Sequence, residues 1–393
     1  MNHDALFIDV HHYACRKWNQ NVCGDSFASK RFDNEGRLIA VLSDGLGSGV
    51  KANILSTMTA NMALRFIAAG TDLLRSCEVM MESLPVCQVR HISYATFSII
   101  DCDLEGMTRV VEEGNPEFVL MRGETPDEIP ARIMTSKMFP SRHMRIAETS
   151  MQAGDRLIVC SDGVTQSGIG TMAYPLGWRR DGLKDFLVDS VRDNPSISSR
   201  ELSQLVVEEA MQLEPNFQPL DDTSCLVMYF RKPRRLMVLS GPPYDEERDP
   251  ECAAILDEFP GKKAICGGST SNLVAREWGV NIDTELPKRG AKLPPCSTMA
   301  GVDLVTEGVL TMTQVARRLE QRDIDTSGGD PADRLIDLLL DSDDIEFLVG
   351  TRINEAHQDP NLPVDLEIRR NIIKRIATAL SDCFLKKTSL RFI

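Results

Sequence analysis

Carboxylates are the residues of this chain whose spacing points to chemistry. Four aspartates stand where a strand-like apolar run meets a turn, namely Asp25, Asp44, Asp162 and Asp221, and the last is followed by Asp222. A set of carboxylates with no histidine or cysteine among them favours a hard cation, Mg²⁺ or Mn²⁺. Two such ions about 3.5 to 4 Å apart can activate a water and stabilise the attacking and leaving oxygens of a phosphoester. The residue types therefore predict metal-assisted phosphate hydrolysis.

The chain around Asp44 predicts how such an acid is positioned. Strand formers occupy residues 40–43, and glycines stand at every second position after Asp44 up to Gly49. Apolar residues then recur every fourth position, at Val50, Ile54, Met58, Met62 and Phe66. This spacing indicates an amphipathic helix that stops at Gly70. We therefore expect a strand that delivers a carboxylate to a glycine-rich turn, followed by a helix.

The later acids, Asp162, Asp221 and Asp222, also stand at the ends of strand-like runs. Asp162 follows the apolar run 156–160, and Asp221 and Asp222 precede the run 223–230. Neighbouring side chains of a strand point to opposite faces, so we expect only one of the two adjacent acids to bind metal.

Four motifs that contain these acids occur in a fixed order: Gly24–Phe27, Ser43–Gly49, Ser161–Val164 and Asp221–Ser224. Together they resemble the SpoIIE-like branch of the PPM metal-dependent serine/threonine protein phosphatases, over residues 1–232. The ordered set is far more specific than any single Asp-Gly turn. The resemblance implies an α+β fold, an α-β-β-α sandwich of two antiparallel sheets covered by helices.

The resemblance also implies roles for individual residues. The candidate metal-binding residues are Asp25, Asp44, Gly45, Asp162, Asp221 and Asp222, and the candidate catalytic residues are Asp25, Asp44, Asp162 and Asp221. Within this set the Gly45 carbonyl would bind the second of two Mn²⁺ or Mg²⁺ ions, and Asp25 would support the site.

Two departures from the eukaryotic-type members of that family concern the phosphate. Those members carry an arginine shortly before the first aspartate, whereas the stretch Asn19–Asp25 contains none. They also carry a histidine after the Asp-Gly pair, where this chain has Leu46. Both departures fit the SpoIIE-like branch. They leave phosphate positioning to the metals and backbone amides, and they leave the general acid unassigned.

Composition limits the remaining function classes. The chain has 393 residues, 42% of them hydrophobic, and a formal net charge of −14. This length predicts two domains, and the acidic balance argues against a nucleic-acid partner. No apolar run approaches the roughly 20 residues of a membrane span, and the first residues lack the layout of a signal peptide, so we expect a cytoplasmic protein without a membrane partner. The eleven scattered cysteines are expected to be reduced and to pack as small hydrophobic residues.

Turn signals in the first domain predict antiparallel strands. Glycine-containing turns at 101–106 and 114–116 separate strand-like runs and indicate hairpins, and residues 153–155 join two further strands of the antiparallel series. The stretch 166–180 follows the Asp162 motif directly and is placed to act as a flap over a substrate. Ser198 and Glu201 have the spacing of a capping box, which predicts a helix start.

A basic joint, Arg231–Arg235, separates residues 1–232 from a second domain, 233–393. Apolar runs there alternate with helical stretches, which predicts a smaller α/β domain with a largely parallel sheet and a regulatory or docking role. The turn of this domain that most favours ligand binding joins a strand to a helix through Gly267, Gly268, Ser269 and Thr270. Exposed amides at such a turn can bind a small anionic ligand, and an ordinary capped turn is the alternative.

Three functions are compatible with these patterns. The leading interpretation is a phosphatase that removes phosphate from phosphoserine or phosphothreonine on a regulatory protein, by a water that two metals activate. By analogy with SpoIIE-like members, that protein would be an anti-sigma-factor antagonist. The alternatives are a phosphatase of small phosphorylated metabolites and a pseudophosphatase whose fold serves as a binding module.

Overall fold

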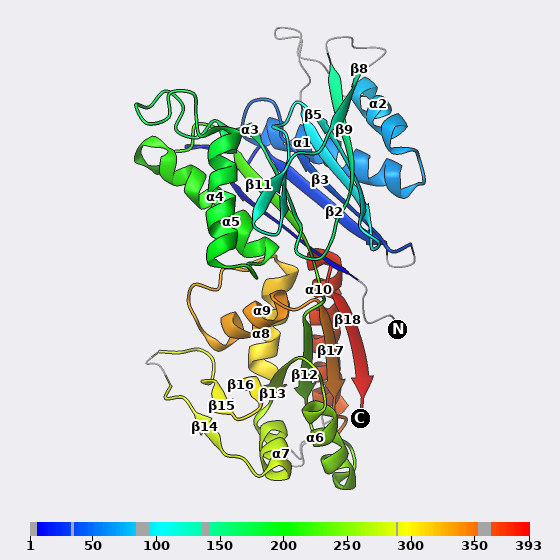
Figure 1. The fold of residues 1–393 in the computed structure, drawn as a ribbon. Coiled ribbons are helices and arrows are strands. Elements are labelled where there is room, and N and C mark those ends of the chain that lie inside the picture. The colour runs from blue at the N-terminus through cyan, green and yellow to red at the C-terminus, as the bar shows by residue number, and fades with distance from the viewer. Residues whose placement is uncertain (1–5, 33–34, 84–94, 136–141, 288–289, 353–362) are drawn as a thin grey trace. The chain divides into compact units, whose positions relative to one another are not determined.

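The computed structural model describes residues 6–32, 35–83, 95–135, 142–287, 290–352 and 363–393 (Figure 1). The chain divides into two compact units, Met1–Lys232 and Pro233–Ile393.

The first unit contains two antiparallel sheets. The five-stranded sheet has the order β1-β11-β10-β6-β7, with β1 (Phe7–Cys15), β11 (Thr223–Arg231), β10 (Arg156–Cys160), β6 (Val119–Arg122) and β7 (Thr125–Asp127). The six-stranded sheet has the order β2-β3-β4-β5-β9-β8, with β2 (Ser26–Phe32), β3 (Arg37–Ser43), β4 (Phe97–Asp103), β5 (Met107–Glu113), β9 (His143–Ser150) and β8 (Ala131–Thr135).

Helices cover the outer face of each sheet (Figure 1). Helices α1 (Val50–Ala68) and α2 (Leu73–Ser83) share a core with Ile39 and Val41 of β3. Helices α4 (Arg179–Asp193) and α5 (Ser199–Leu213) share a core with Val227 of β11. Alternate residues of the same strands, such as Leu38 and Met228, are fully buried on the inner faces. This arrangement confirms the predicted α-β-β-α sandwich.

One of the two predicted hairpins is wrong. The turn at 101–106 does join the paired strands β4 and β5. The turns at 114–116 and 153–155 instead carry the chain from one sheet to the other, because β5 and β9 belong to the six-stranded sheet while β6 and β10 belong to the five-stranded one. A glycine turn specifies that the chain reverses, but burial of the strand faces decides which strand becomes the partner.

The apolar stripe predicted for α1 forms only part of its buried face, because Met62 and Phe66 are half-buried against the core while the first three residues are exposed. Val50, Ile54 and Met58 are 62%, 53% and 52% exposed. The buried residues are Ala52, Ser56, Thr59, Ala60, Ala63 and Ile67. A spacing of four residues drifts by about 40° around a helix at each step, so the stripe starts on the exposed side and turns toward the core by Met62 and Phe66. Small residues let the helix approach the sheet closely.

The second unit has one seven-stranded sheet of order β14-β15-β16-β13-β12-β17-β18. Its strands are β14 (Ile282–Thr284), β15 (Ser297–Met299), β16 (Val302–Thr306), β13 (Lys262–Cys266), β12 (Arg235–Ser240), β17 (Asp344–Val349) and β18 (Lys387–Phe392). The pairs from β16 to β18 are parallel, which agrees with the predicted α/β domain. The strands β14, β15 and β18 carried no clear sequence signal.

Helices cover both faces of this sheet. One core contains residues of α8 (Val309–Glu320), α9 (Pro331–Leu340) and α10 (Pro363–Phe384). The other contains residues of α6 (Asp249–Asp257) and α7 (Gly268–Trp278). Three short helices complete the described elements: α3 (Asp162–Thr165) and the 3₁₀ helices η1 (Pro215–Phe217) and η2 (Glu246–Arg248).

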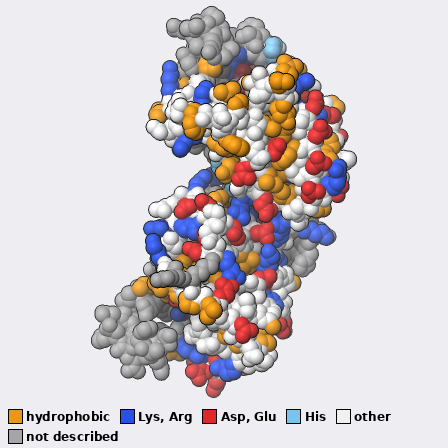
Figure 2. All heavy atoms as spheres, turned by 90° about the vertical axis from the view of Figure 1, so that its left-hand side faces the viewer, with side chains coloured by type: hydrophobic (Ala, Val, Ile, Leu, Met, Phe, Trp, Pro, Cys, Tyr) orange, Lys and Arg blue, Asp and Glu red, His pale blue; other side chains and the backbone are white. Residues whose placement is uncertain are grey.

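Two surface properties bear on the partners. None of the helices in the described ranges has the length and apolar character needed to cross a membrane. On the face drawn in Figure 2, Lys and Arg side chains are interspersed with Asp and Glu and form no continuous basic surface.

Candidate active site

Pairing of β2 with β3 brings the first two acids to the same end of the six-stranded sheet. Asp25 immediately precedes β2 and Asp44 immediately follows β3, and Ser26 lies opposite Ser43 in the antiparallel register. Asp25 is only 6% exposed, and its Oδ2 accepts a 2.5 Å hydrogen bond from the Ser224 hydroxyl of β11. This bond links the two sheets at the end where the acids lie.

The other acids lie at the corresponding end of the five-stranded sheet. Asp162 begins α3 just beyond β10, and Asp221 and Asp222 precede β11. Ser161 and Ser224 join these strand ends, because the Ser161 amide donates to the Ser224 carbonyl and the Ser224 amide donates to the Ser161 hydroxyl, both at 3.0 Å.

Glycines allow these segments to come close together. A Cβ on Gly163 would lie 2.1 Å from the Asp222 carbonyl oxygen, and a Cβ on Gly24 would lie 2.7 Å from Asp222 Oδ2. A Cβ on Gly45 would lie 2.2 Å from the Ala52 carbonyl oxygen in the first turn of α1. The structure thus places all four acidic motifs at one end of the sandwich.

Burial, together with neighbouring negative charge, raises the pKa values of Asp25, Asp44 and Asp221. Burial is the largest cause of the raised pKa of Asp44, and the negative charges of Asp25 and Asp162 add to it. Burial likewise raises the pKa of Asp25, while hydrogen bonds from Ser224 and Ser161 oppose the rise. Burial raises the pKa of Asp221 as well. Carboxylates gathered in this way repel one another unless protons or a cation compensate them.

The donor atoms fit a hard divalent cation. Asp25 Oδ1 and Asp222 Oδ2 are buried without a hydrogen-bond partner, all the candidate ligands are oxygens, and a cation would relieve the repulsion. In the described parts of the chain, no three His, Cys, Asp or Glu side chains already form a group that could hold a metal ion.

Several neighbours of the acids carried no sequence signal as site residues. The Gln166 side chain donates to Asp162 Oδ2 at 2.8 Å, and the Lys17 amide donates to Asp222 Oδ1 at 3.0 Å. Ser161 directly precedes Asp162 and Ser224 lies two residues after Asp222, so both lie within the motifs, which is a signal for supporting hydroxyls. Lys17 lies outside the motifs and was not predicted.

The segment predicted as a flap begins at Gln166 and leads into α4. Met172 is fully exposed, whereas Trp178 is 8% exposed and packs in the core beneath the helix. Arg180 forms an ion pair of 2.9 Å with Glu128 and donates to the Phe118 carbonyl, so its guanidinium serves the fold.

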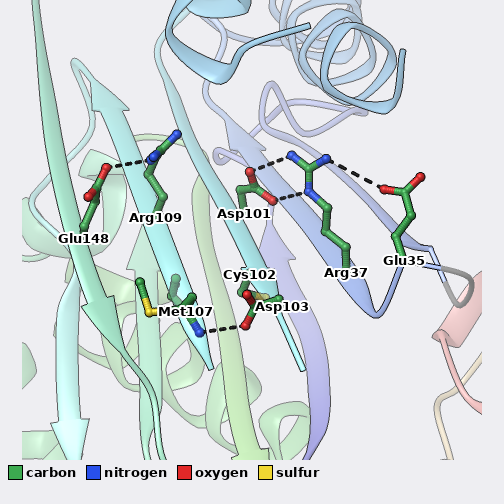
Figure 3. A pocket seen from close by; sticks show the side chains of 9 residues that line it. Glu35, Arg37, Asp101, Cys102, Asp103, Met107, Arg109 and Glu148 are labelled. Atoms are coloured by element: carbon green, nitrogen blue, oxygen red, sulfur yellow. Dashed lines mark hydrogen bonds and ion pairs between the residues drawn. The ribbon is translucent and has the colours of Figure 1, made fainter. Parts of the chain in front are cut away.

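A pocket of about 420 Å³ lies at the opposite end of β3 from Asp44. Figure 3 shows its charged side chains in pairs, with Arg37 on Asp101 and Arg109 on Glu148. These ion pairs measure 2.7 and 2.8 Å, and the pocket contains none of the candidate site residues.

In the second unit, the predicted anion site lies where β13 leads into α7. Gly267 has a φ of 135°, and no side chain caps the start of α7. The Thr270 hydroxyl accepts a 2.9 Å hydrogen bond from the Gly241 amide beyond β12. A Cβ on Gly268 would meet no atom within 4 Å, so this part of the turn is open.

Comparison with known proteins gives one family. Residues 34–231, just over half of the chain, match the model of the family described as Stage II sporulation protein E (SpoIIE). Stage II sporulation protein E of Bacillus subtilis (strain 168) is 21% identical over 208 residues. The aligned region is 53% of this chain and 24% of that protein, so the chain spans about a quarter of its relative.

Solved structures similar to this chain include the PP2C phosphatase domain, with a fragment of the regulatory domain, of SpoIIE from Bacillus subtilis. That comparison has a TM-score of 0.48 and 19% identity, and it covers 58% of this chain and 63% of the other. RsbX in complex with magnesium gives a TM-score of 0.38 and 19% identity, over 57% of this chain and 95% of the other.

Proposed function

Because this chain belongs to the SpoIIE family, we propose that residues 1–232 form a metal-dependent protein phosphatase. Its substrate would be phosphoserine or phosphothreonine on a regulatory protein, and an anti-sigma-factor antagonist is the candidate by analogy. The observation that supports this most is the meeting of four acidic motifs at one end of both sheets, tied by the bond from Ser224 to Asp25.

Each acid would have a defined role in this phosphatase. Asp44, Asp162 and Asp221 would bind Mg²⁺ or Mn²⁺ together with the Gly45 carbonyl, and Asp25 would support them. Two bound ions would supply the Lewis acidity that phosphoester hydrolysis needs. Ser224 fixes the orientation of Asp25, and Gln166 does the same for Asp162.

Turnover of p-nitrophenyl phosphate and of phosphoserine and phosphothreonine peptides tests this proposal. We expect hydrolysis that requires Mn²⁺ or Mg²⁺ and stops when the ions are chelated. Activity confined to small phosphorylated metabolites would favour the metabolite phosphatase. If no substrate turns over with either ion, the fold is better explained as a pseudophosphatase binding module.

For residues 233–393 we propose a regulatory or docking role. The open turn from Gly267 to Thr270 is the candidate site for a small anion. We expect a chain that ends at Lys232 to stay folded and to retain basal activity. A soluble but inactive fragment would show that the phosphatase depends on the second unit.

A further inference from the structure

Three large apolar side chains lie exposed beside the acidic end of the sandwich. Trp18, Phe217 and Leu220 are 51%, 65% and 55% exposed. Leu220 immediately precedes Asp221, and the Cα atoms of consecutive residues are about 3.8 Å apart. The Trp18 amide donates to the Pro219 carbonyl at 3.0 Å, which holds the Trp18 loop against the segment before Asp221. The three apolar residues therefore border a candidate metal ligand.

Phe217 has a backbone conformation that phenylalanine rarely adopts. Its φ is 56°, and the preceding Asn216 has a φ of 58°. The left-handed region is strained for a bulky residue and is concentrated at functional sites. The Phe217 ring lies mostly in solvent, so packing of this side chain does not impose the conformation. The strain is therefore better explained by a function of the exposed ring than by stability of the fold.

Hydrogen bonds fix the segment that carries Phe217 and Leu220. The Phe217 amide donates to the Glu214 carbonyl at 3.0 Å. Burial raises the pKa of the Glu214 carboxyl, while hydrogen bonds from the amides of Gly168 and Leu220 oppose that rise. Glu214 thus holds the backbone at both apolar residues. A surface that is already ordered loses less conformational entropy when it binds a partner.

The residue types indicate what this surface binds. Neighbours of the three apolar residues include the uncharged amides Asn19, Asn216 and Gln218. Aromatic side chains with few charges among them and polar groups at the edge are typical of the centre of a protein–protein interface. A small phosphorylated metabolite has no need of such a surface. A phosphoprotein has, because contacts away from its phosphate supply binding energy that brings the charged group to an acidic site.

We propose that Trp18, Phe217 and Leu220 dock a phosphoprotein through apolar side chains that lie near its phosphoserine or phosphothreonine. The proposal rests on the phosphatase function proposed above and specifies the class of its substrate. A partner that covers Leu220 brings its phosphate to Asp221, because these two residues are adjacent. The apolar contacts select the protein, and the acidic end acts on its phosphate.

Two phosphoserine peptides of equal length and charge test this with the full chain. One carries leucine and phenylalanine on both sides of the phosphoserine, and the other carries serine at those positions. We expect the parent to turn over the apolar peptide with a kcat/KM about tenfold higher, as for one strong interface contact. Phe217→Gly and Leu220→Ser should remove most of this preference. Ile133→Ser is the matched control and should keep it, because Ile133 is exposed on β8, the opposite edge strand from β2.

Thermal melting separates a docking role of Phe217 from a structural one. Glycine adopts a positive φ without strain, so Phe217→Gly should melt at or above the parental Tm. A lowered Tm would show that the side chain supports the fold, and the docking role of Phe217 would then be withdrawn.

Binding of the labelled apolar peptide in metal-free buffer, followed by fluorescence anisotropy, does not require turnover. The parent and Ile133→Ser should bind it about tenfold more tightly than Phe217→Gly. If the parent is inactive with metal but this difference remains, the phosphatase function fails and the docking surface stands. Equal binding by the parent and Phe217→Gly overturns the docking proposal, whether or not the enzyme is active. A changed oligomeric state of Phe217→Gly also overturns it, because a second copy of the chain would then cover these residues.

Discussion

Two glycine turns of this chain each lead a strand into a helix, but one carries an acidic residue and the other carries no charged residue. In the first unit, β3 leads through Gly49, with a φ of 73°, into α1. In the second unit, β13 leads through Gly267, with a φ of 135°, into α7. Neither helix start has a side-chain cap. The first turn carries Asp44 beside the buried Asp25, whereas the second carries hydroxyls and open glycine.

This difference shows that the backbone of such a turn does not decide what it binds. A helix start offers amides and a positive dipole end, which favour an anion. Buried carboxylates close to the helix start reverse that preference and favour a cation. The side chains that neighbouring strands bring to the turn therefore determine its chemistry.

Loss of a carboxylate from the first turn should produce the largest effect. We expect Asp44→Asn to reduce metal-dependent turnover by more than about a hundredfold, since even the supporting partners of metal ligands typically contribute tenfold to hundredfold. The far-UV circular dichroism and the Tm without metal should stay near parental values. Asp185→Asn, on the exposed side of α4, is the control. Near-parental turnover of Asp44→Asn would refute its role as a metal ligand.

Adding one methyl group to each turn should lower the free energy of unfolding much more in the first turn than in the second. Gly45→Ala would place Cβ 2.2 Å from the Ala52 carbonyl oxygen, whereas Gly268→Ala meets no atom within 4 Å. We expect Gly45→Ala to lower the free energy of unfolding by about 1 to 3 kcal/mol or more, as overpacking does. Gly268→Ala should change it by less than about 0.5 kcal/mol. Urea unfolding measures both, and equal losses would contradict the packing described for the turns.

Removal of the Ser224 hydroxyl, which links the two sheets, should lower the free energy of unfolding somewhat less. Ser224→Ala removes the hydrogen bond to Asp25 Oδ2 and leaves a buried carboxylate with less compensation. We expect a loss of about 1 to 2 kcal/mol in the free energy of unfolding, measured without metal. Ser224→Thr keeps a hydroxyl and serves as the conservative comparison. An unchanged stability of the alanine variant would mean that the bond does not support Asp25.

The anion preference of the second turn should give the smallest effect. At a phosphate concentration near its dissociation constant, binding stabilises a protein by only about 0.4 kcal/mol. We therefore expect phosphate to raise the Tm of the metal-free parent slightly. Phosphate should leave the Tm of Gly268→Val unchanged, because the valine side chain would cover the open amides. The same rise in both proteins would show that the turn is structural.

The position of the acids at strand ends could be predicted because its signals are local. Asp44 and Asp162 each follow an apolar run and precede a glycine, and this order alone determines that they stand at strand ends. The apolar run after Asp221 predicts strand β11 equally clearly. The capping box from Ser198 to Glu201 is also present in the structure, because both of its hydrogen bonds lie within one turn of helix.

Features that depend on distant partners were not predicted. The turns near Gly114 and Gly154 change sheets, which only the burial of both strand faces decides. Ile54 on α1 was expected to be buried but is exposed. The helix sequence alone does not show that small residues are needed where the helix approaches the sheet closely. Lys17 reaches the acids through Asp222, and no spacing rule connects these two residues.

Pairing of the first and last strands of the catalytic unit has a consequence for synthesis. Strand β1 pairs with β11 along its whole length, with Phe7 opposite Arg231 and Cys15 opposite Thr223. During translation, β1 emerges from the ribosome long before its partner exists, and such non-local contacts form slowly. Asp25 likewise gains its Ser224 partner only when β11 has been made. A nascent chain should therefore acquire its acidic centre in one late step, and a ribosome stalled before residue 221 would hold a chain that lacks it.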